Sequence, residues 1–250
     1  MKNIRETFKT PVKLELPHGV VEILRDDACD HGYIKNGEPN INGYLNRLLP
    51  ALSDNLNDLH TELIKHYGGD EGYAKIAIQG IYHVYLNRSA FQSGGKFEVS
   101  LRVNQSSYED FLTIHDERLA LLDMDFREYA RTLLKEYTAK SLPEREELFA
   151  YRLLVDVKKS IGKNQCKQFS FYHNDIREVF APVVIEQSLI SDRSYVFGFA
   201  EDHRMIAVRV LDLQQVNPTN RKMEVTEEMA FRLVDYVDEV FEKEGKKCLA

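Results

Sequence analysis

Arg209 is the residue of this chain whose placement most clearly suggests binding chemistry. It stands between Val208 and Val210 in a run of alternating apolar and polar residues, 205–213, which is typical of a half-buried strand. Because successive side chains of a strand point to opposite faces, Arg209 must face away from both valines. A single cation on a small apolar sheet could anchor an anion. The spacing alone leaves open the alternative of a solvated arginine on an outer face.

No arrangement in the sequence predicts catalysis or a bound metal. Cys29 and His31 form one isolated Cys-x-His pair, whereas a structural zinc site needs about four ligands. Asp123 and Asp125 precede an apolar helical pattern, which is typical of a helix cap. The sequence contains neither Gly-x-Gly-x-x-Gly nor a Walker-type loop. We therefore expect a protein that is not an enzyme and that needs neither a cofactor nor a metal.

The composition indicates a globular protein from a reducing compartment. The 250 residues are 43% hydrophobic and 29% charged, with a net charge of −7. This acidic total argues against a protein that coats duplex DNA through a large positive field. Three cysteines lie far apart, and no apolar run approaches the roughly 20 residues of a membrane span. We expect a cytoplasmic protein without membrane contact.

One pattern occurs twice in the first 140 residues. Each copy has a strand, at 12–17 or 99–103, followed by two helices. Asn40 is the expected N-cap of the second helix in copy one, and Asp125 takes that place in copy two. The copies align at these positions: Val12, Leu14, Leu16, Leu24, Tyr44, Leu48 and Leu49 with Val99, Leu101, Val103, Phe111, Tyr129, Leu133 and Leu134.

This order of elements resembles the ribbon-helix-helix family. The resemblance implies that two copies pair their strands into one antiparallel ribbon over helices, here within a single chain. Lys13 and Glu15 in copy one, and Ser100 and Arg102 in copy two, would then face outward. In the family such residues read DNA bases. Glu15 has the wrong sign for contact with phosphate, so we favour the fold over the duplex-DNA function.

Two helices are expected between the copies, at 54–67 and 70–87. The second, with Ile76, Ile78, Ile81, Tyr82 and Tyr85, is apolar nearly all round, as a buried or interface helix would be. This helix makes a homodimer plausible.

The pattern of residues from 143 onward predicts a helix, a group of short strands and a final helix. Short strands with short polar links suggest a small closed or half-closed barrel. The expected ranges are a helix at 143–161, strands at 167–173, 183–189, 195–199 and 205–216, and a helix at 226–244.

Four of these elements resemble a WYL domain, an Sm-like or SH3-like β-barrel of bacterial regulators. Tyr195 and Gly198 agree with its name-giving signature, and Ser194 stands where the family has tryptophan. The quoted segments are 169–172 (Phe-Ser-Phe-Tyr), 182–185 (Pro-Val-Val-Ile), 194–200 (Ser-Tyr-Val-Phe-Gly-Phe-Ala) and 208–212 (Val-Arg-Val-Leu-Asp).

The resemblance implies a site for single-stranded RNA or a nucleotide ligand. An arginine presents a planar fork to phosphate, and tyrosine rings stack on unpaired bases. The predicted nucleic-acid-binding residues are Arg209, Tyr195, Tyr172, Ser194, Arg193, Lys13 and Arg102. A core role is the alternative for Tyr195 and Tyr172.

The combination of the two families resembles the WYL accessory proteins of type VI-D CRISPR systems. It implies a non-catalytic regulator that binds single-stranded RNA and modulates an RNA-guided ribonuclease. A DNA-binding transcriptional regulator with a WYL sensor, and a dimeric protein-interaction module, are the alternatives. We expect an α+β chain with ribbon-helix-helix copies at 1–52 and 96–142, a helical insert at 53–95, a WYL domain at 143–216 and a C-terminal helix at 217–250.

Overall fold

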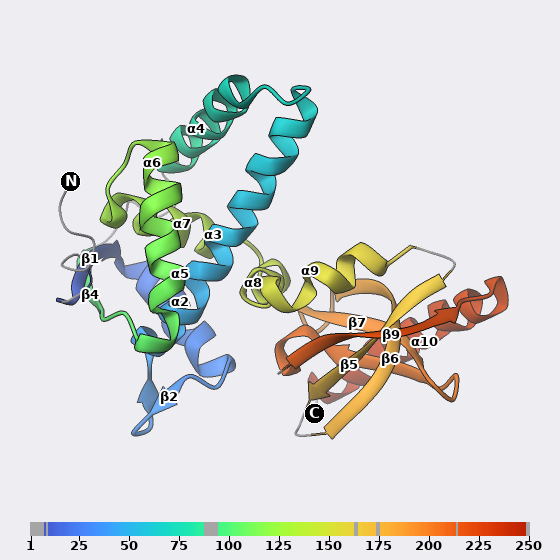
Figure 1. Cartoon of the computed structure of the whole chain (residues 1–250). Helices are drawn as coiled ribbons and strands as arrows, with labels where there is room; N and C mark the ends of the chain where they lie inside the picture. Colours follow the sequence, from blue (N-terminus) through green and yellow to red (C-terminus); the bar gives the residue numbers. More distant parts are fainter. Residues whose placement is uncertain are drawn as a thin grey trace. The chain divides into compact units, whose positions relative to one another are not determined.

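The computed structural model describes residues 8, 10–87, 95–162, 165–173, 176–213 and 215–248. The chain divides into two units, Met1–Lys140 and Ser141–Ala250, and each combines helices with antiparallel strands (Figure 1). The expected α+β class is confirmed. Within the described ranges, the helices are too short or too polar to cross a membrane.

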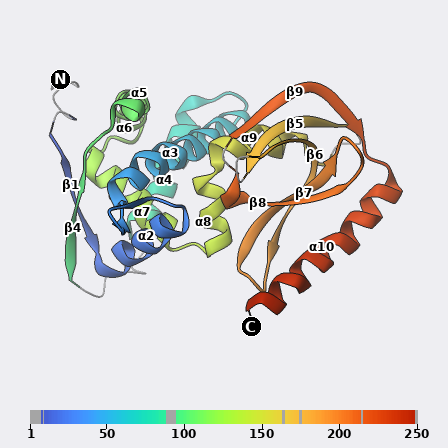
Figure 2. The ribbon, with the colours of Figure 1, turned by 90° about the horizontal axis from the view of Figure 1, so that it is seen from below.

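The first unit contains a two-stranded ribbon made from segments far apart in the sequence. Strand β1 (Val12–Pro17) pairs antiparallel with β4 (Lys96–Leu101), with Leu14 opposite Val99 (Figure 2). Leu14, Leu16 and Leu101 are fully buried on its inner face. The two strands expected from the repeated pattern are therefore partners, although β4 begins three residues earlier and ends two residues earlier than the expected strand at 99–103.

The helices of the first unit are α2 (His18–Asp30), α3 (Ile41–His66), α4 (Glu71–Asn87), α5 (Tyr108–Thr113), α6 (Leu119–Leu122) and α7 (Phe126–Thr138). Of these, α2, α3 and α7 lie against the ribbon. A π-helical turn, Ile114–Arg118, joins α5 to α6. Both expected caps are present: Asn40 Oδ1 accepts from the Gly43 amide at 3.0 Å, and Asp125 Oδ1 accepts from the Arg127 amide at 2.7 Å.

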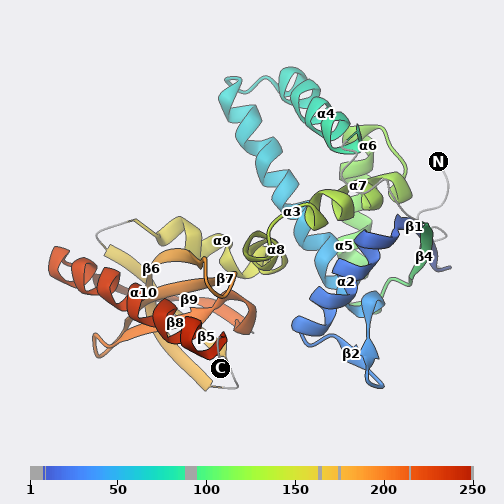
Figure 3. The same ribbon diagram turned by 180° about the vertical axis from the view of Figure 1, so that it is seen from behind.

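Helix α3 differs from the sequence-based expectation. Two separate helices were expected, one following the Asn40 cap and one at 54–67, but α3 runs through Pro50 as a single helix, so the expected boundary between residues 52 and 53 lies inside it. Proline removes one backbone hydrogen bond, and the buried side chains of Leu48, Leu49 and Leu52 on both sides of it offset that cost. Helix α4 then returns from the end of α3 through a turn at Gly68 and Gly69, both with positive φ (Figure 3).

A small hairpin precedes α3. Strands β2 (Ile34–Lys35) and β3 (Glu38–Pro39) pair around Asn36 and Gly37, whose φ angles are 55° and 82°. Positive φ at both central residues is the geometry that an Asn-Gly turn favours.

The second unit is built around one five-stranded antiparallel sheet. Its strand order is β8-β7-β6-β5-β9, and its edge strands β8 and β9 do not pair within the described ranges. Of the expected closed or half-closed barrel, the closed form is therefore not observed. The elements are α8 (Leu142–Phe149), α9 (Tyr151–Ser160), β5 (Gln165–His173), β6 (Ile176–Ser188), β7 (Arg193–Ala200), β8 (Met205–Arg209), β9 (Gln215–Glu224) and α10 (Glu227–Cys248).

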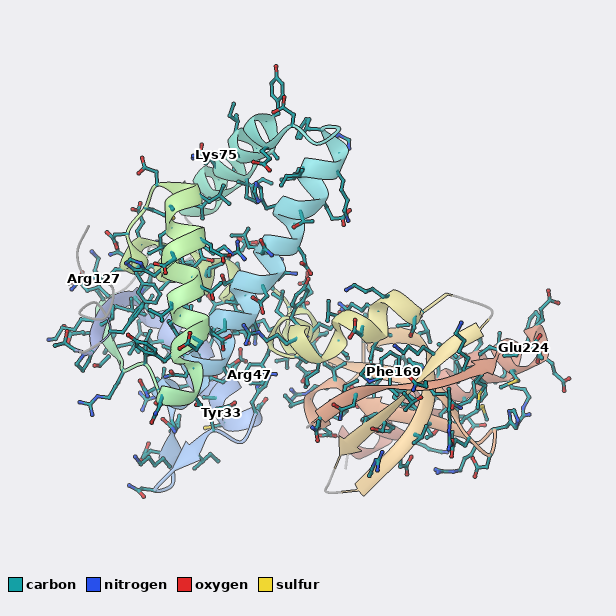
Figure 4. The ribbon with its side chains drawn as sticks, in the orientation of Figure 1. Tyr33, Arg47, Lys75, Arg127, Phe169 and Glu224 are labelled. Atoms are coloured by element: carbon teal, nitrogen blue, oxygen red, sulfur yellow. The ribbon has the colours of Figure 1, made fainter. Side chains whose placement is uncertain are left out.

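Helices cover both faces of this sheet at its central strands, whereas the edge strand β9 is mostly exposed. Leu154 and Val157 of α9 pack with Phe169, labelled in Figure 4, on one side. On the other side Leu233 of α10 packs with Phe197, and Figure 2 shows α10 along the sheet. This double cover explains why β7 is apolar at almost every position, since neither of its faces meets solvent.

Gly198 allows β6 and β7 to approach each other closely. A β-carbon at this position would lie 2.1 Å from the carbonyl oxygen of Ala181 on β6. The pairing register shifts directly afterwards, between Pro182 and Val184, as in a β-bulge. A glycine is therefore required where the two strands meet.

Two expected elements of this unit need correction, and one strand was not expected. The strand expected at 205–216 ends at Arg209, and a 3-10 helix, η3 (Val210–Asp212), follows it. Strand β9 then begins at Gln215 and continues to Glu224, so residues 217–224, which were assigned to the C-terminal helix segment, belong to the sheet. The helix expected at 143–161 is divided at Ala150 into α8 and α9.

Candidate functional site

Four of the predicted site residues lie together where β7 begins and β8 ends. Tyr195 is the cross-strand partner of Arg209, and Arg193 and Ser194 directly precede Tyr195 on β7. We call these four residues the β7–β8 site. Their proximity follows from the antiparallel pairing, which brings the start of one strand to the end of the next.

Arg209 has the loosest environment of the four. Its side chain is 32% exposed, and its ion pair within the described residues, from Nε to Asp212 Oδ2, spans 3.9 Å. That distance exceeds the range of a hydrogen bond. Nε is buried and has no hydrogen-bond partner in the described part of the chain. The guanidinium therefore retains donors that could bind an anion.

Tyr195, in contrast, is an internal residue. It is 4% exposed, and its ring contacts those of Phe197 and Phe241, the latter on α10. Its hydroxyl donates to Glu244 of α10. Burial and the Glu244 carboxylate together raise the pKa of Tyr195 above its ordinary value. While α10 occupies this position, the ring is covered and cannot stack on a base.

Arg193 and Ser194 are held by carboxylates from α8. Glu146 is fully buried; its Oε1 accepts from Arg193 Nη1 at 2.6 Å, and its Oε2 accepts from the Ser194 amide at 3.1 Å. Ser194 Oγ donates to Glu147 Oε1 at 3.1 Å. Ser194, where the WYL signature has tryptophan, thus lies at a helix–strand contact.

Burial raises the pKa of Glu146, and the Ser194 amide and Arg193 oppose the shift. Arg209 also stabilises the charged form of this carboxylate. The acidic residues Glu146 and Glu244 were not among the predicted site residues. Glu146 belongs to an acidic run in a helix, which gives no sign in the sequence that one of its members is buried.

The remaining predicted residues lie elsewhere. Tyr172 belongs to β5 and pairs with Arg177 and Gln215, but its side chain is outside the described part of the structure. Lys13 and Arg102 belong to the first unit, and both are exposed as expected.

Charges largely cancel on the outer face of the ribbon. Lys13 Nζ lies 2.9 Å from Glu98 Oε1, and Lys96 lies 3.8 Å from Glu15. Glu15 and Glu98 are directly opposite each other across the two strands. Arg102, just beyond β4, uses its backbone amide and carbonyl to bind Asn42 and Asn46 of α3. The ribbon therefore presents nearly equal positive and negative charge.

In the described ranges, histidine, cysteine, aspartate and glutamate side chains form no cluster of three that could hold a metal. The polar groups that do gather, around Glu146 and Glu244, belong to hydrogen-bonded contacts between helices and the sheet.

No family model and no curated protein matches this chain. Its structure is similar to a crystal structure described as that of "a CRISPR Cas-related protein", with a TM-score of 0.60 and 11% sequence identity. The match covers 87% of this chain and 64% of the other, so this chain spans less than two thirds of that protein. At this identity, the similarity establishes a shared fold.

Proposed function

We propose that the chain is a non-catalytic regulatory protein that binds single-stranded RNA through its second unit and modulates an RNA-guided CRISPR ribonuclease. The observation that carries RNA binding is the Arg209 side chain, which is 32% exposed and whose Nε has no hydrogen-bond partner within the described residues. The CRISPR assignment draws on the fold shared with the protein described as CRISPR Cas-related.

We infer further that the second unit is a WYL domain. Its sheet is a meander of β5, β6, β7 and β8, and the last strand, β9, returns to pair with β5. This order is compatible with an Sm-like or SH3-like barrel. Gly198, which agrees with the family signature, has a structural reason to be glycine because β6 passes so close to it.

A phosphate at Arg209 would replace the long ion pair to Asp212. Arginine binds phosphate through parallel N–H donors, and such charge-assisted bonds are about twice as strong as neutral ones. Tyr195 would contribute to base stacking only after α10 has moved away. Arg209 is therefore the residue on which we expect RNA affinity to depend most.

The test is a titration of the protein with labelled single-stranded RNA and with duplex DNA at low and high salt. We expect tighter binding to the RNA. Arg209→Ala should weaken RNA binding by about 1–3 kcal/mol. Arg204→Ala is the matched control, because Arg204 is exposed on the β7–β8 turn and already faces Glu178 and Asp202. Equal losses in the two variants, or no loss in either, would contradict the assignment of Arg209.

A DNA-binding transcriptional regulator is the second candidate. The antiparallel pairing of β1 with β4, backed by helices, favours a ribbon-helix-helix pseudo-dimer within one chain. The opposed carboxylates of Glu15 and Glu98 on the outer face weigh against duplex binding, because both would approach phosphate. Tight duplex binding with a steep salt dependence would favour this candidate over the first.

We also propose that the protein forms a homodimer through α4. Tyr73, Ile76 and Val84 are 63%, 66% and 61% exposed on this helix. Tyr73 and Ile76 are three positions apart and so are neighbours on its surface, and Val84 lies about two turns further along. Such exposure of large apolar side chains is typical of an interaction face. Sedimentation equilibrium of the wild type and of Ile76→Lys tests this proposal, because the variant should be monomeric.

A further inference from the structure

A groove of about 280 Å³ lies between α10 and β6 in the second unit. Apolar side chains form most of its lining, and Glu186 and Asp238 are its two acidic members. The residues that line it are Val183, Val184, Glu186, Ala230, Leu233, Val234, Val237 and Asp238. The pairing register of β6 shifts at this point, and the shift accounts for two consecutive valines contributing to one groove.

The apolar surface continues from the groove onto the outside of α10. Val234 is 61% exposed and Phe231, one helical turn earlier, is 77% exposed. Residues three positions apart are neighbours on a helix surface, so Phe231 extends the apolar lining outward. The groove is smaller than the roughly 300–1,000 Å³ typical of small-molecule pockets. Its size and its open apolar edge suit the side chains of a protein segment better than a whole cofactor.

The surroundings of this groove are strongly acidic. Residues 227–244 of α10 contain seven acidic and two basic residues, a net charge of −5, and Lys246 and Lys247 bring the whole helix to −3. One ion pair, from Lys243 to Glu239 at 3.5 Å, reduces this charge, and Glu244 is engaged with Tyr195 and Ser191. The helix therefore combines exposed apolar side chains with a negative field.

We propose that this groove is the docking site for a basic amphipathic segment of a partner protein. Apolar side chains of that segment would enter between Val184 and Val234, and its lysine or arginine side chains would lie near Glu186 and Asp238. Complementary charge steers such an encounter and disfavours wrong partners. A second copy of this chain would bring two acidic helices together, and RNA would bring phosphate to them, so both are poor occupants.

The test uses a fluorescein-labelled helical peptide of lysine and leucine, with all leucines on one face, titrated against the full chain by fluorescence anisotropy. A scrambled peptide of the same composition has the same charge but no apolar face. Val234 and Asp238 are exposed on α10, so the variants Val234→Lys and Asp238→Lys should leave the sheet intact. Each should weaken binding of the amphipathic peptide by about tenfold or more, and the scrambled peptide should bind more weakly to the wild type.

Two matched controls separate the groove from general charge effects. Glu228→Lys changes the charge of the same helix outside the groove lining, and Ile34→Lys places a lysine on an exposed apolar residue of the first unit. Both should retain affinity within about twofold, a difference of less than 0.5 kcal/mol. Arg209→Ala should also bind the peptide as the wild type does, so this test is independent of RNA binding.

Three results would overturn the proposal. The first is equal affinity of the wild type for the amphipathic and scrambled peptides. The second is unchanged binding to Val234→Lys. The third is a wild-type dimer in sedimentation equilibrium that Val234→Lys dissociates, since the groove would then hold a second copy.

Discussion

The hydroxyl oxygens of Tyr44 and Tyr137 lie 2.6 Å apart in the core of the first unit, although 93 positions separate the residues in the chain. Tyr137 donates to Asp27 Oδ2 at 2.8 Å, so Tyr44 must donate to Tyr137. A second tyrosine makes the reverse connection, because Tyr129 of α7 donates to Ser53 of α3 at 2.9 Å. Tyr44 and Tyr129 occupy matching positions of the sequence repeat, and each donates a hydrogen bond to the other of the two helices, α3 and α7.

Tyr137→Phe should destabilise the first unit by about 1–3 kcal/mol, because it removes two buried hydrogen bonds next to the Asp27 carboxylate. Hydrogen exchange over α3 and α7 measures this loss without contribution from the second unit. Tyr73→Phe is the control, since Tyr73 is 63% exposed. Unchanged protection of α3 and α7 in Tyr137→Phe would mean that the bonds contribute nothing.

Glu244→Gln should lower the pKa of Tyr195. Burial, first, and the Glu244 carboxylate raise this pKa above its ordinary 10.0. The contribution of Tyr195 to stability is thus complete below pH 10.0 and is lost as the pH rises further, because the unfolded chain releases the proton first. An amide removes the negative charge but not the burial, so the pKa should fall yet stay raised.

The tyrosinate absorbance of Glu244→Gln, compared with the same variant carrying Tyr195→Phe, isolates this titration. Glu239→Gln serves as the control on the same helix. If the Tyr195 titrations of the wild type and Glu244→Gln coincide, the carboxylate does not act on the phenol.

Gly198→Ala should destabilise the second unit by about 3 kcal/mol or more, since its β-carbon would meet the Ala181 carbonyl and the backbone must shift. Gly80→Ala provides the opposite case. Gly80 lies in α4 with no atom within 4 Å of the added carbon, so alanine should stabilise the helix by about 0.5–1 kcal/mol. Thermal unfolding followed by circular dichroism compares the two. Equal and small effects would refute the close approach of β6 and β7.

The double substitution Glu15→Gln and Glu98→Gln should strengthen binding to duplex DNA and steepen its salt dependence. It leaves Lys13, Lys96 and Arg102 without nearby carboxylates on the ribbon. Removing the same charge at Glu227 and Glu228 of α10 is the control. Filter binding at several salt concentrations gives the slope. Equal gains in both double variants would show that total charge, and not the ribbon face, governs binding.

Much of the fold could be predicted because the periodicity of its elements is strong. Strand β1 alternates without exception, and Asn40 and Asp125 cap their helices as expected. Strand β9 was missed because its sequence contains Asn217, Pro218 and Asn220, which are depleted in strands. It is an edge strand, where proline is tolerated because one side of the strand makes no ladder bonds. The Asn36-Gly37 dipeptide favours a two-residue hairpin turn, but the β2–β3 hairpin around it was not predicted from the sequence.

The site was predictable only in part. The alternation around Arg209 correctly indicated a side chain directed away from Val208 and Val210, both of which are buried. The pattern could not reveal that α10 covers Tyr195 or that Glu146 is buried against Arg193. Those contacts depend on which helix packs on which face of the sheet, and side-chain periodicity within one strand carries no information about that.

The pairing of β1 with β4 also has a consequence for the newly made chain. Lys13 and Glu98, paired across the ribbon, are 85 positions apart, so the ribosome completes β1 long before its partner strand exists. Until then Leu14 and Leu16 lie on an unpaired strand, which is a site for association between chains. A fragment that ends before β4 keeps this edge permanently, so expression of the first unit requires β4 to be included.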